Sequence, residues 1–170
     1  MRSLADGKLK FSILTTAPAN PAAPTVTELN AGLDASPYVL TSDFNWTNAE
    51  SATFDEKPLS QKGQAQTLGM SMYTLAATIF REYAPEGGVS TEDDATFQAL
   101  KAKGTTVWGY ARETDKDATE PWAETDECYL GGEVQTDAPA RVGNEGSIKR
   151  RVIFLPQSMH EDITVAVGTP

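Results

Sequence analysis

Residues 66–83, with the sequence QTLGMSMYTLAATIFREY, form the most apolar stretch of the chain. As an extended segment the stretch is semi-apolar on both faces, because Tyr73, Leu75, Ala77 and Ile79 alternate with Met72, Thr74, Thr78 and Phe80. The alternative is a helix with one apolar side, but Thr, Tyr, Ile and Phe prefer pleated surfaces and Gly69 weakens a helix. We therefore predict a strand, and a strand buried on both faces usually has other layers or other chains above and below it.

The N-terminal part of the chain predicts a strand, a connector and a short helix. Lys8–Leu14 alternates polar and apolar residues, which indicates a half-buried strand with its leucine, phenylalanine and isoleucine side chains inside. Ala17–Pro24 is rich in proline and alanine, as is typical of a loop. Thr25-Val26-Thr27-Glu28 has the form of a capping box, so we expect a helix over Val26–Ala31, closed by Gly32.

The region before the apolar stretch carries little structural signal. We expect a brief strand over Pro37–Leu40. Thr41–Ala65 is polar, lacks periodicity and is broken by Pro58 and Gly63. A loop of that length is uncommon inside a compact domain. The segment is therefore functional, disordered by itself, or ordered by a partner.

The C-terminal half predicts one helix and several strands. Thr91 and the acids after it predict a helix over Glu92–Lys103, stopped by Gly104. The strands that we expect are Thr105–Arg112, with Trp108 and Tyr110 on one face, Cys128–Gln135, interrupted by Gly131-Gly132, Ile148–Leu155, and Ile163–Val167. The chain 1–170 is therefore predicted to be one mainly β domain of roughly seven strands with one central helix.

Composition and charge exclude several classes of protein. The 14 Lys and Arg residues against 24 Asp and Glu residues give a net charge of −10, which argues against a nucleic-acid reader with a basic face. No apolar run is long enough to cross a membrane, and the polar N-terminus lacks the apolar core of a secretory signal. Because Cys128 is the single cysteine, no internal disulfide can form, and we expect a protein made in a cytoplasm.

The sequence contains no recognisable catalytic or cofactor motif. It lacks the phosphate loop, the dinucleotide-binding turn, the zinc-protease helix and the nucleophile elbow. His160 lies in a turn-like patch beside Glu161 and Asp162, where we interpret it as a solvated side chain rather than a general base. Cys128 follows an acidic run, which would raise its pKa and make it a poor nucleophile. We expect no catalysis, no cofactor and no metal.

Two charged segments stand out. Glu113–Glu127 is strongly acidic with Lys116 as its only base, and it lacks the spacing of a helix–loop–helix calcium site, so we interpret it as a solvated, self-repelling loop. Lys149-Arg150-Arg151 is the only basic tract, and on a strand its side chains alternate between two faces. We expect the tract to meet an acidic surface on a neighbouring copy rather than a phosphate backbone.

The order of these elements resembles a known family. It begins with Gly7-Lys8-Leu9-Lys10-Phe11, the connector Ala17–Pro24 and Thr25-Val26-Thr27-Glu28-Leu29-Asn30-Ala31-Gly32. Leu33–Leu40, a long polar loop, a helix from Asp93-Asp94 to Gly104 and a Trp-containing strand follow. This order resembles the major tail proteins, or tail tube proteins, of long, non-contractile-tailed bacteriophages, particularly those of actinobacterial hosts. The most specific stretch is Ala22–Gly32.

The resemblance implies a fold and a function. The fold is a β-sandwich or barrel-like tail-tube domain with one flanking helix at about 92–103 and a long extended loop at about 41–65. The function is that of a structural virion protein whose hexameric rings stack into a hollow tail tube. The tube grows around a tape-measure protein and later conducts double-stranded DNA into the host without binding it specifically.

The resemblance also implies partners. They are further copies of the chain and the tape-measure, tail-tip and tail-terminator proteins, with no membrane partner. In the family, long strands join neighbouring subunits into an inner barrel and a long loop reaches the next ring. Residues 34–65 are therefore expected to form an arm between subunits.

Candidate assembly residues follow from this resemblance and from the patterns above. Segment 66–80 suits a strand sealed against neighbouring copies, because unpaired strand edges pair with other chains. The candidates for self-assembly are Gln66, Leu68, Met70, Met72, Tyr73, Leu75, Ile79, Phe80, Lys149, Arg150 and Arg151. Because an acidic wall repels DNA, we expect Glu113, Asp115 and Asp117 to face the lumen.

Other interpretations compete with this one. A monomeric β-barrel or sandwich that binds a small ligand or a cell-surface target has the same composition, and a stable monomer with a dry internal cavity would favour it. A small hydrolase would use His160 with nearby acids, and an unchanged function after His160→Ala would exclude it. Among virion proteins, a tail terminator, a capsid-decoration protein and a contractile-type tube are alternatives, and the order of elements favours the tube of a flexible tail.

Overall fold

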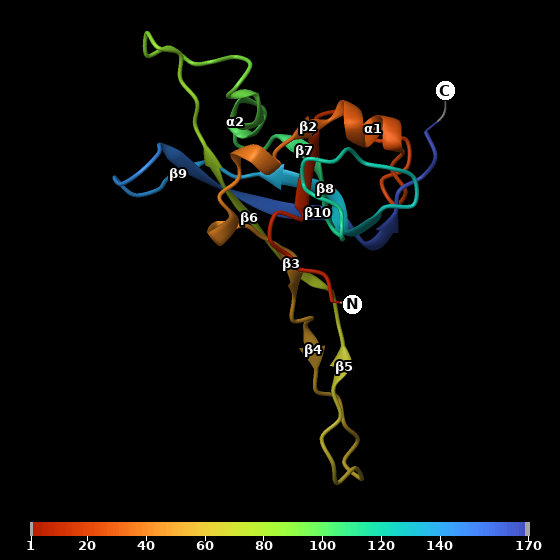
Figure 1. The fold of residues 1–170 in the computed structure, drawn as a ribbon. Helices are drawn as coiled ribbons and strands as arrows, with labels where there is room; N and C mark the ends of the chain where they lie inside the picture. The colour runs from red at the N-terminus through yellow and green to blue at the C-terminus, as the bar shows by residue number, and fades with distance from the viewer. Residues whose placement is uncertain (1, 169–170) are drawn as a thin grey trace.

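One antiparallel sheet path runs through the body of the molecule (Figure 1). The structure is a computed structural model that describes residues 2–168. Its strands are β1 (Leu9–Leu14), β2 (Leu33–Asp34), β3 (Asn45–Ala49), β4 (Thr53–Phe54), β5 (Thr67–Leu68), β6 (Met72–Phe80), β7 (Thr106–Glu113), β8 (Glu127–Thr136), β9 (Ala140–Arg141) and β10 (Lys149–Thr164). The α-helices are α1 (Val26–Ala31) and α2 (Ala95–Leu100), and the 3-10 helices are η1 (Ser36–Tyr38) and η2 (Thr41–Asp43). The mainly β prediction is confirmed.

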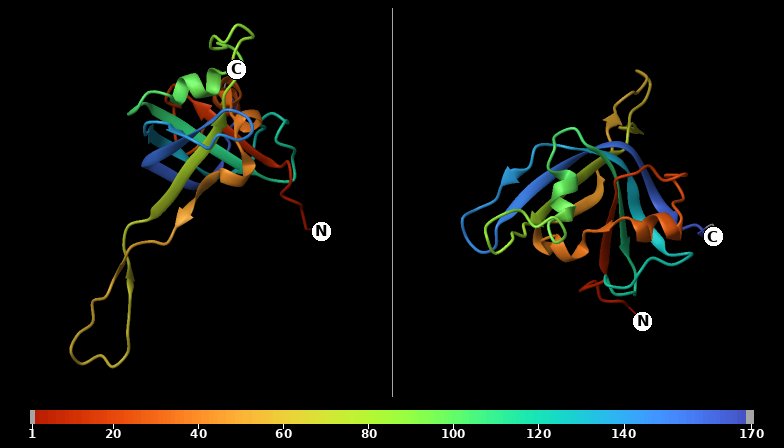
Figure 2. Two further views of the ribbon diagram at one scale, coloured as in Figure 1. Left: turned by 90° about the vertical axis from the view of Figure 1, so that its left-hand side faces the viewer. Right: turned by 90° about the horizontal axis from the view of Figure 1, so that it is seen from above.

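The long strand β10 joins the two halves of the body. The path follows the order β2-β1-β7-β8-β10-β6-β3, with β9 paired to β10 beside it. Residues 149–153 of β10 pair with β6, and residues 154–164 pair with β8. The register shifts between Pro156 and Ser158, and such a bulge bends a strand and increases its twist. The sheet is therefore bent, as the view from above shows (Figure 2).

The main core is formed by side chains from β1, β3, β6, β7, β8, β10 and α2. Trp46 of β3 sits at its centre, with its ring 4.7 Å from that of Phe11 and 5.5 Å from that of Phe154. The indole Nε1 donates a hydrogen bond of 3.0 Å to the backbone carbonyl of Leu130. Helix α2 adds Phe97 and Leu100 to the same cluster. Trp46 thus joins β3 to β1, β8 and β10, and α2 contributes to the same core.

A second core lies on the opposite face of β1 and β7. It is formed by Leu14, Leu29, Tyr110, Trp122, Cys128, Ile163 and Val165. Helix α1 and the segment 114–126 supply Leu29 and Trp122, so they cover this face. Strands β1 and β7 are therefore enclosed on both faces. The prediction of a half-buried β1 is wrong for this reason, since Lys10 and Ser12 are only 4% and 1% exposed.

The capping box predicted for α1 is confirmed. The Thr25 side chain accepts from the Glu28 amide, and the Glu28 carboxylate accepts from the Thr25 amide. Helix α1 ends at Gly32, which has an extended backbone, so a left-handed turn is not what requires glycine there. A Cβ atom at this position would lie 3.1 Å from the carbonyl oxygen of Ile13. The glycine lets the helix end pack closely on β1.

Several predicted elements differ from the observed ones. Pro37–Leu40 was expected as a strand but begins within η1, because the proline fits the first turn of a helix and lacks the N–H that a strand needs. The helix expected over Glu92–Lys103 is shorter and spans Ala95–Leu100, with Asp94 at its N-cap in an ion pair with Arg81. The long loop 41–65 contains η2, β3 and β4.

The glycine pair in β8 does not interrupt the strand. Gly131 and Gly132 continue the ladder with both β7 and β10. A Cβ atom at Gly131 would collide with the ring of Tyr110, and one at Gly132 would collide with the backbone of Ser158. The two glycines therefore allow close packing inside a continuous strand. Likewise, Ile148–Leu155 and Ile163–Val167 were expected as two separate strands, but the single strand β10 (Lys149–Thr164) runs through the bulge from the first into Ile163 and Thr164, and residues 165–167 lie beyond it.

No helix within residues 2–168 combines the length and the apolar character that a membrane crossing requires.

Candidate functional site

The most prominent surface feature is an arm formed by residues 50–71. It projects from the body beyond β3 and β6 (Figures 1 and 2). At its base, β3 and β6 pair from Asn45↔Ala76 to Ala49↔Met72. Farther out, the Ala52 amide donates to the Met70 carbonyl, and β4 pairs with β5. The arm is therefore a ribbon of two antiparallel segments anchored in the main core by β3.

The arm exposes several large apolar side chains to solvent. Leu59 is fully exposed, Leu68 and Met70 are each 77% exposed, and Phe54 is 55% exposed. Two-stranded ribbons are marginally stable by themselves, and clustered exposed apolar groups mark interaction surfaces. The arm has the composition of a segment that is completed by a partner.

The structure divides the assembly candidates of segment 66–80 into two groups. Gln66, Leu68 and Met70 lie exposed on the arm, Met72 is exposed at its base, and Tyr73 and Phe80 are half-buried. Leu75 and Ile79 are instead enclosed in the main core of their own chain. Gly69 to Ser71 also separate β5 from β6, so the expected continuous strand is broken there.

The two-sided burial of β6 arises within the chain. Its inner face packs on the main core through Leu75, Ala77 and Ile79. On its outer face, Thr78 is fully buried because η2 covers it. The Thr78 hydroxyl donates to the Asp43 carboxylate, and the Thr78 carbonyl accepts from the Leu40 amide. A layer of the same subunit, rather than a neighbouring copy, therefore covers this part of the strand.

The basic tract Lys149-Arg150-Arg151 is split by the fold. Arg151 forms an ion pair with Asp43 of η2. The hydrogen bonds that Asp43 receives from Thr78 and Arg151 lower the pKa of its carboxyl group. Arg150 lies directly opposite Arg141 in the β9–β10 ladder, and like charges in that position repel. Among the described residues, Arg141, Lys149 and Arg150 have no ion-pair partner. We call these three residues the basic corner.

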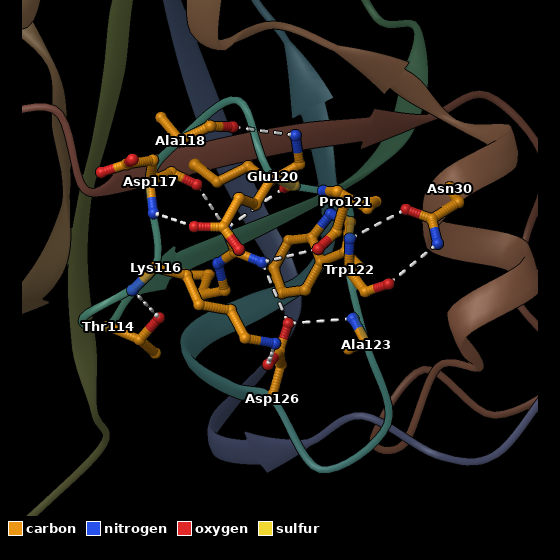
Figure 3. A network of polar contacts seen from close by, with 12 residues as sticks. Asn30, Thr114, Lys116, Asp117, Ala118, Glu120, Pro121, Trp122, Ala123 and Asp126 are labelled. Carbon is orange, nitrogen blue, oxygen red and sulfur yellow. Dashed lines mark hydrogen bonds and ion pairs between the residues drawn. The ribbon is translucent and has the colours of Figure 1, made fainter.

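The acidic loop 114–126 is a folded cover and not a solvated, self-repelling segment as the sequence suggested. Arg112 of β7 is fully buried, and the loop residues that contact it are drawn in Figure 3. Its guanidinium donates to the Asp126 carboxylate at 2.9 Å and to the backbone carbonyls of Asp117, Glu120 and Pro121. Lys116 forms a second ion pair with Asp126. One buried cation thus organises the loop.

Trp122 fixes the same loop to α1 and β1. Its amide donates to the Asn30 side chain at 2.9 Å, and its carbonyl accepts from that side chain at 3.0 Å (Figure 3). Its indole donates to the Ser12 hydroxyl at 2.8 Å. Sequence reasoning missed Arg112 and Trp122 as organisers of the loop. The available signal was a lone arginine at a strand end followed by an excess of acids.

The three acids expected in a lumen lie on one stretch of surface near the N-terminus. Glu113 ends β7 and is exposed, as are Asp115 and Asp117. The Lys8 ammonium forms an ion pair of 2.7 Å with Asp117 and donates to the Asp115 carbonyl at 2.8 Å. The carboxylates of Glu113 and Asp115 have no ion pair among the described residues.

An apolar cavity opens near the base of the arm. It has a volume of about 350 Å³ and is lined by Leu9, Phe11, Pro37, Val39 and Phe44, with Ala118 and Thr119 of the acidic loop on one side. These residues come from β1, the segment around η1 and η2, and the loop 114–126. The sequence could not reveal the cavity, because its lining is assembled from separate parts of the chain.

The residues considered for catalysis are poorly placed for it. His160 was expected in a turn but lies within β10, opposite Gly131. Burial raises the pKa of the Cys128 thiol to about 12, so it is protonated at neutral pH and enclosed in the second core. Within residues 2–168, no group of three or more His, Cys, Asp or Glu side chains is arranged to hold a metal ion.

A family model described as phage tail tube protein matches residues 1–169. No curated protein matches the chain.

Proposed function

The chain belongs to the phage tail tube protein family, and from this premise we propose that it forms stacked, hexameric rings through which the genome is delivered. The family places the protein in the virion tail as a structural protein that assembles with itself and with other tail proteins. Six-fold symmetry and DNA passage are parts of the proposal. The observation that supports it best is the arm with its exposed apolar side chains.

We propose that the chain 1–170 is one tail-tube domain with an arm between rings. The arm that the sequence placed at 34–65 covers a different range, because Ala35 and Trp46 are buried in the main core and belong to the body. The projecting part begins after β3 and includes Leu68 and Met70 on its return. A contact between the arm of one copy and the body of another is heterologous, and a heterologous contact that does not close produces a filament.

Contacts within a ring are proposed to use strand edges and charge. Strand β3 is an edge of the sheet path, and an unpaired edge can accept a strand from another chain. The basic corner would face acids of a neighbouring copy, which would offset the repulsion between Arg141 and Arg150. Arg151 is less suited to that role, since Asp43 already neutralises it.

The lumen is proposed to be acidic and to pass DNA without specific binding. The net charge of −10 fits a wall that repels phosphates, whereas a basic wall would hold the duplex. Glu113, Asp115 and Asp117 are the proposed lumen acids. Further proposed partners are the tape-measure protein, the tail-tip proteins and the tail terminator. No cofactor, metal or catalytic step forms part of this function.

The test is removal of the arm with its anchor kept in place. Deleting all of Thr41–Ala65 would also remove Trp46 and part of the core, so the informative variant replaces residues 51–69 with an Asn-Gly turn. We expect folded subunits or rings that form no tubes. Negative-stain electron microscopy and sedimentation velocity, with and without a tail-tip initiator, measure the outcome beside the full chain.

Two results would oppose the proposal. Tubes of normal length from the arm deletion would show that the arm is dispensable for stacking. Persistent monomers of the full chain, even with a tail-tip initiator, would favour the alternative of a monomeric binding module.

A further inference from the structure

We infer that the arm tip of one copy docks Leu59 into the apolar cavity at the arm base of another copy. The inference rests on the proposed stacking and names the surface that receives the arm. Three observations support the docking. They are the shape of the arm tip, the lining and charge of the cavity, and the positions of the tip and the cavity on the molecule.

The tip presents one apolar side chain at its apex. The Gln61 amide donates to the Pro58 carbonyl at 3.0 Å, which closes a turn with Leu59 and Ser60 at its centre. Leu59 is fully exposed, and Lys57 and Lys62 lie close to it in the sequence. The end of the arm is therefore a leucine with basic neighbours.

The cavity offers the complementary surface. Its floor is formed by leucine, phenylalanine, valine and proline side chains, and it is open to solvent. Asp34 is the acid in its lining, and Asp117 and Glu120 directly flank the lining residues Ala118 and Thr119 in the sequence. Asp34 and Asp117 are paired with Lys10 and Lys8, whereas the carboxylate of Glu120 has no ion pair within residues 2–168. A leucine flanked by lysines matches an apolar cavity with such an acid at its edge.

The positions of tip and cavity require two copies. From Ala49 to Leu59 the arm has ten residues, which span roughly 30 Å when extended. The arm points away from the body (Figure 1), while the cavity includes Phe44, which directly precedes β3, at the end of that strand opposite to the arm. The tip therefore lies the combined length of β3 and the arm away from its own cavity. A second copy displaced by that distance along the arm brings its cavity to the tip, and repetition of this step builds a stack.

A disulfide test can detect the contact directly. Thr119 lines the cavity and is exposed. The only native cysteine, Cys128, is buried, so it does not compete with the introduced thiols. In assemblies of the double variant Leu59→Cys, Thr119→Cys, mild oxidation should link each copy to two others. We expect a ladder beyond the dimer in non-reducing electrophoresis. Either cysteine alone should give no ladder, and Leu59→Cys with Ser147→Cys is the matched control at another exposed loop.

An assembly test measures the strength of the contact. Burial of a leucine side chain favours association by about 10–100-fold. Leu59→Ser should therefore raise the critical concentration for tube formation by about that factor. Ser60→Ala, in the same turn, should leave it within about twofold, because the adjacent serine adds little apolar area.

The outcomes separate this docking from the proposed function. Tubes that form normally from Leu59→Ser, with no disulfide ladder in the double cysteine variant, would overturn the docking and leave the tube function standing. Failure of the unchanged chain to stack under any condition, including with an initiator, would overturn both. A disulfide ladder only in the control variant Leu59→Cys, Ser147→Cys would show that the arm tip contacts the loop at Ser147 instead of the cavity, and would also overturn the docking.

Discussion

Arg112 and Asp126 form a buried ion pair in which Nη1 lies 2.9 Å from Oδ2, and this pair closes the acidic loop over β7. Their side chains are 0% and 6% exposed. A buried pair often contributes little compared with apolar residues, but removing one partner leaves an uncompensated charge. The loop that covers the second core therefore depends on this contact.

Asp126→Ala should lower the free energy of unfolding by about 3–5 kcal/mol, because Arg112 would stay buried with only Lys116 and backbone carbonyls nearby. Urea denaturation at pH 7 measures the change. Asp115→Ala is the matched control on the exposed part of the loop and should change the value by less than about 0.5 kcal/mol. An equal, small effect of both substitutions would contradict the prediction.

Stability should fall in acid through specific carboxylates. Burial alone would raise the pKa values of Asp94 and Asp126, but hydrogen bonds from Arg81 and Gln98 to the first, and from Lys116, Ala123 and Arg112 to the second, lower both. Because these pKa values are lower in the folded state, the unfolded chain binds protons at a higher pH than the folded chain as the solution is acidified. The stabilisation is therefore present above about pH 4, the ordinary aspartate value, and is lost as the pH falls through the folded pKa.

The acid dependence can be measured as the thermal midpoint between pH 7 and pH 2.5. We expect a decline below about pH 4 that becomes shallower in Asp94→Asn, since amides do not titrate. Asp93→Asn, at an exposed neighbouring position, should leave the slope unchanged. If the thermal midpoint falls equally steeply with pH in the unchanged chain, Asp94→Asn and Asp93→Asn, then groups other than Asp94 cause the acid dependence.

Trp46 should control both the stability of the body and the anchoring of the arm. Trp46→Phe removes the hydrogen bond to the Leu130 carbonyl and should cost about 1–3 kcal/mol, whereas Trp46→Ala should cost about 3–5 kcal/mol. Hydrogen exchange of the β3 and β6 amides should accelerate in the same order. Unchanged exchange in Trp46→Ala would show that the arm is anchored elsewhere.

Gly131→Ala should destabilise the chain by about 1–3 kcal/mol, because the added Cβ would enter the ring of Tyr110 and the buried ladder must shift. Gly63→Ala is the control, since nothing lies within 4 Å of the added atom. Thermal unfolding of the two variants gives the comparison. Equal thermal midpoints of the two variants would mean that the packing between β7 and β8 accommodates the added Cβ atom without a loss of stability.

Charge reversal at the basic corner should weaken assembly in a salt-dependent way. Lys149→Glu with Arg150→Glu should raise the critical concentration for tubes at low salt, and the difference should shrink as salt screens the charges. Arg151 is left unchanged because its pairing with Asp43 belongs to the folded subunit. Lys103→Glu, with a side chain 76% exposed, is the control. Unchanged assembly at every ionic strength would remove the charge-pairing proposal.

Local patterns predicted the elements whose determinants lie close together in the chain. The capping box from Thr25 to Glu28 predicted α1 correctly, because its two hydrogen bonds join residues three apart. The alternation in Thr105–Arg112 predicted β7, and that in 72–80 predicted β6 rather than a helix. Strand β3 was missed, because its sequence around Trp46 is polar and the strand is formed by pairing with β6, a segment about 25 residues later in the chain.

The sequence by itself determined the mainly β class, helix α1, the lack of a recognisable catalytic motif and the resemblance to tail tube proteins, because propensity, periodicity and motif spacing act over a few residues. Only the tertiary structure decided which polar residues are buried. Lys10, Arg112 and Asp126 look solvated in the sequence, yet all three are buried, the first two against the acidic loop and Asp126 within it. The reason is that burial depends on layers that distant segments supply, and each buried charge is stabilised by a partner that the fold brings to it.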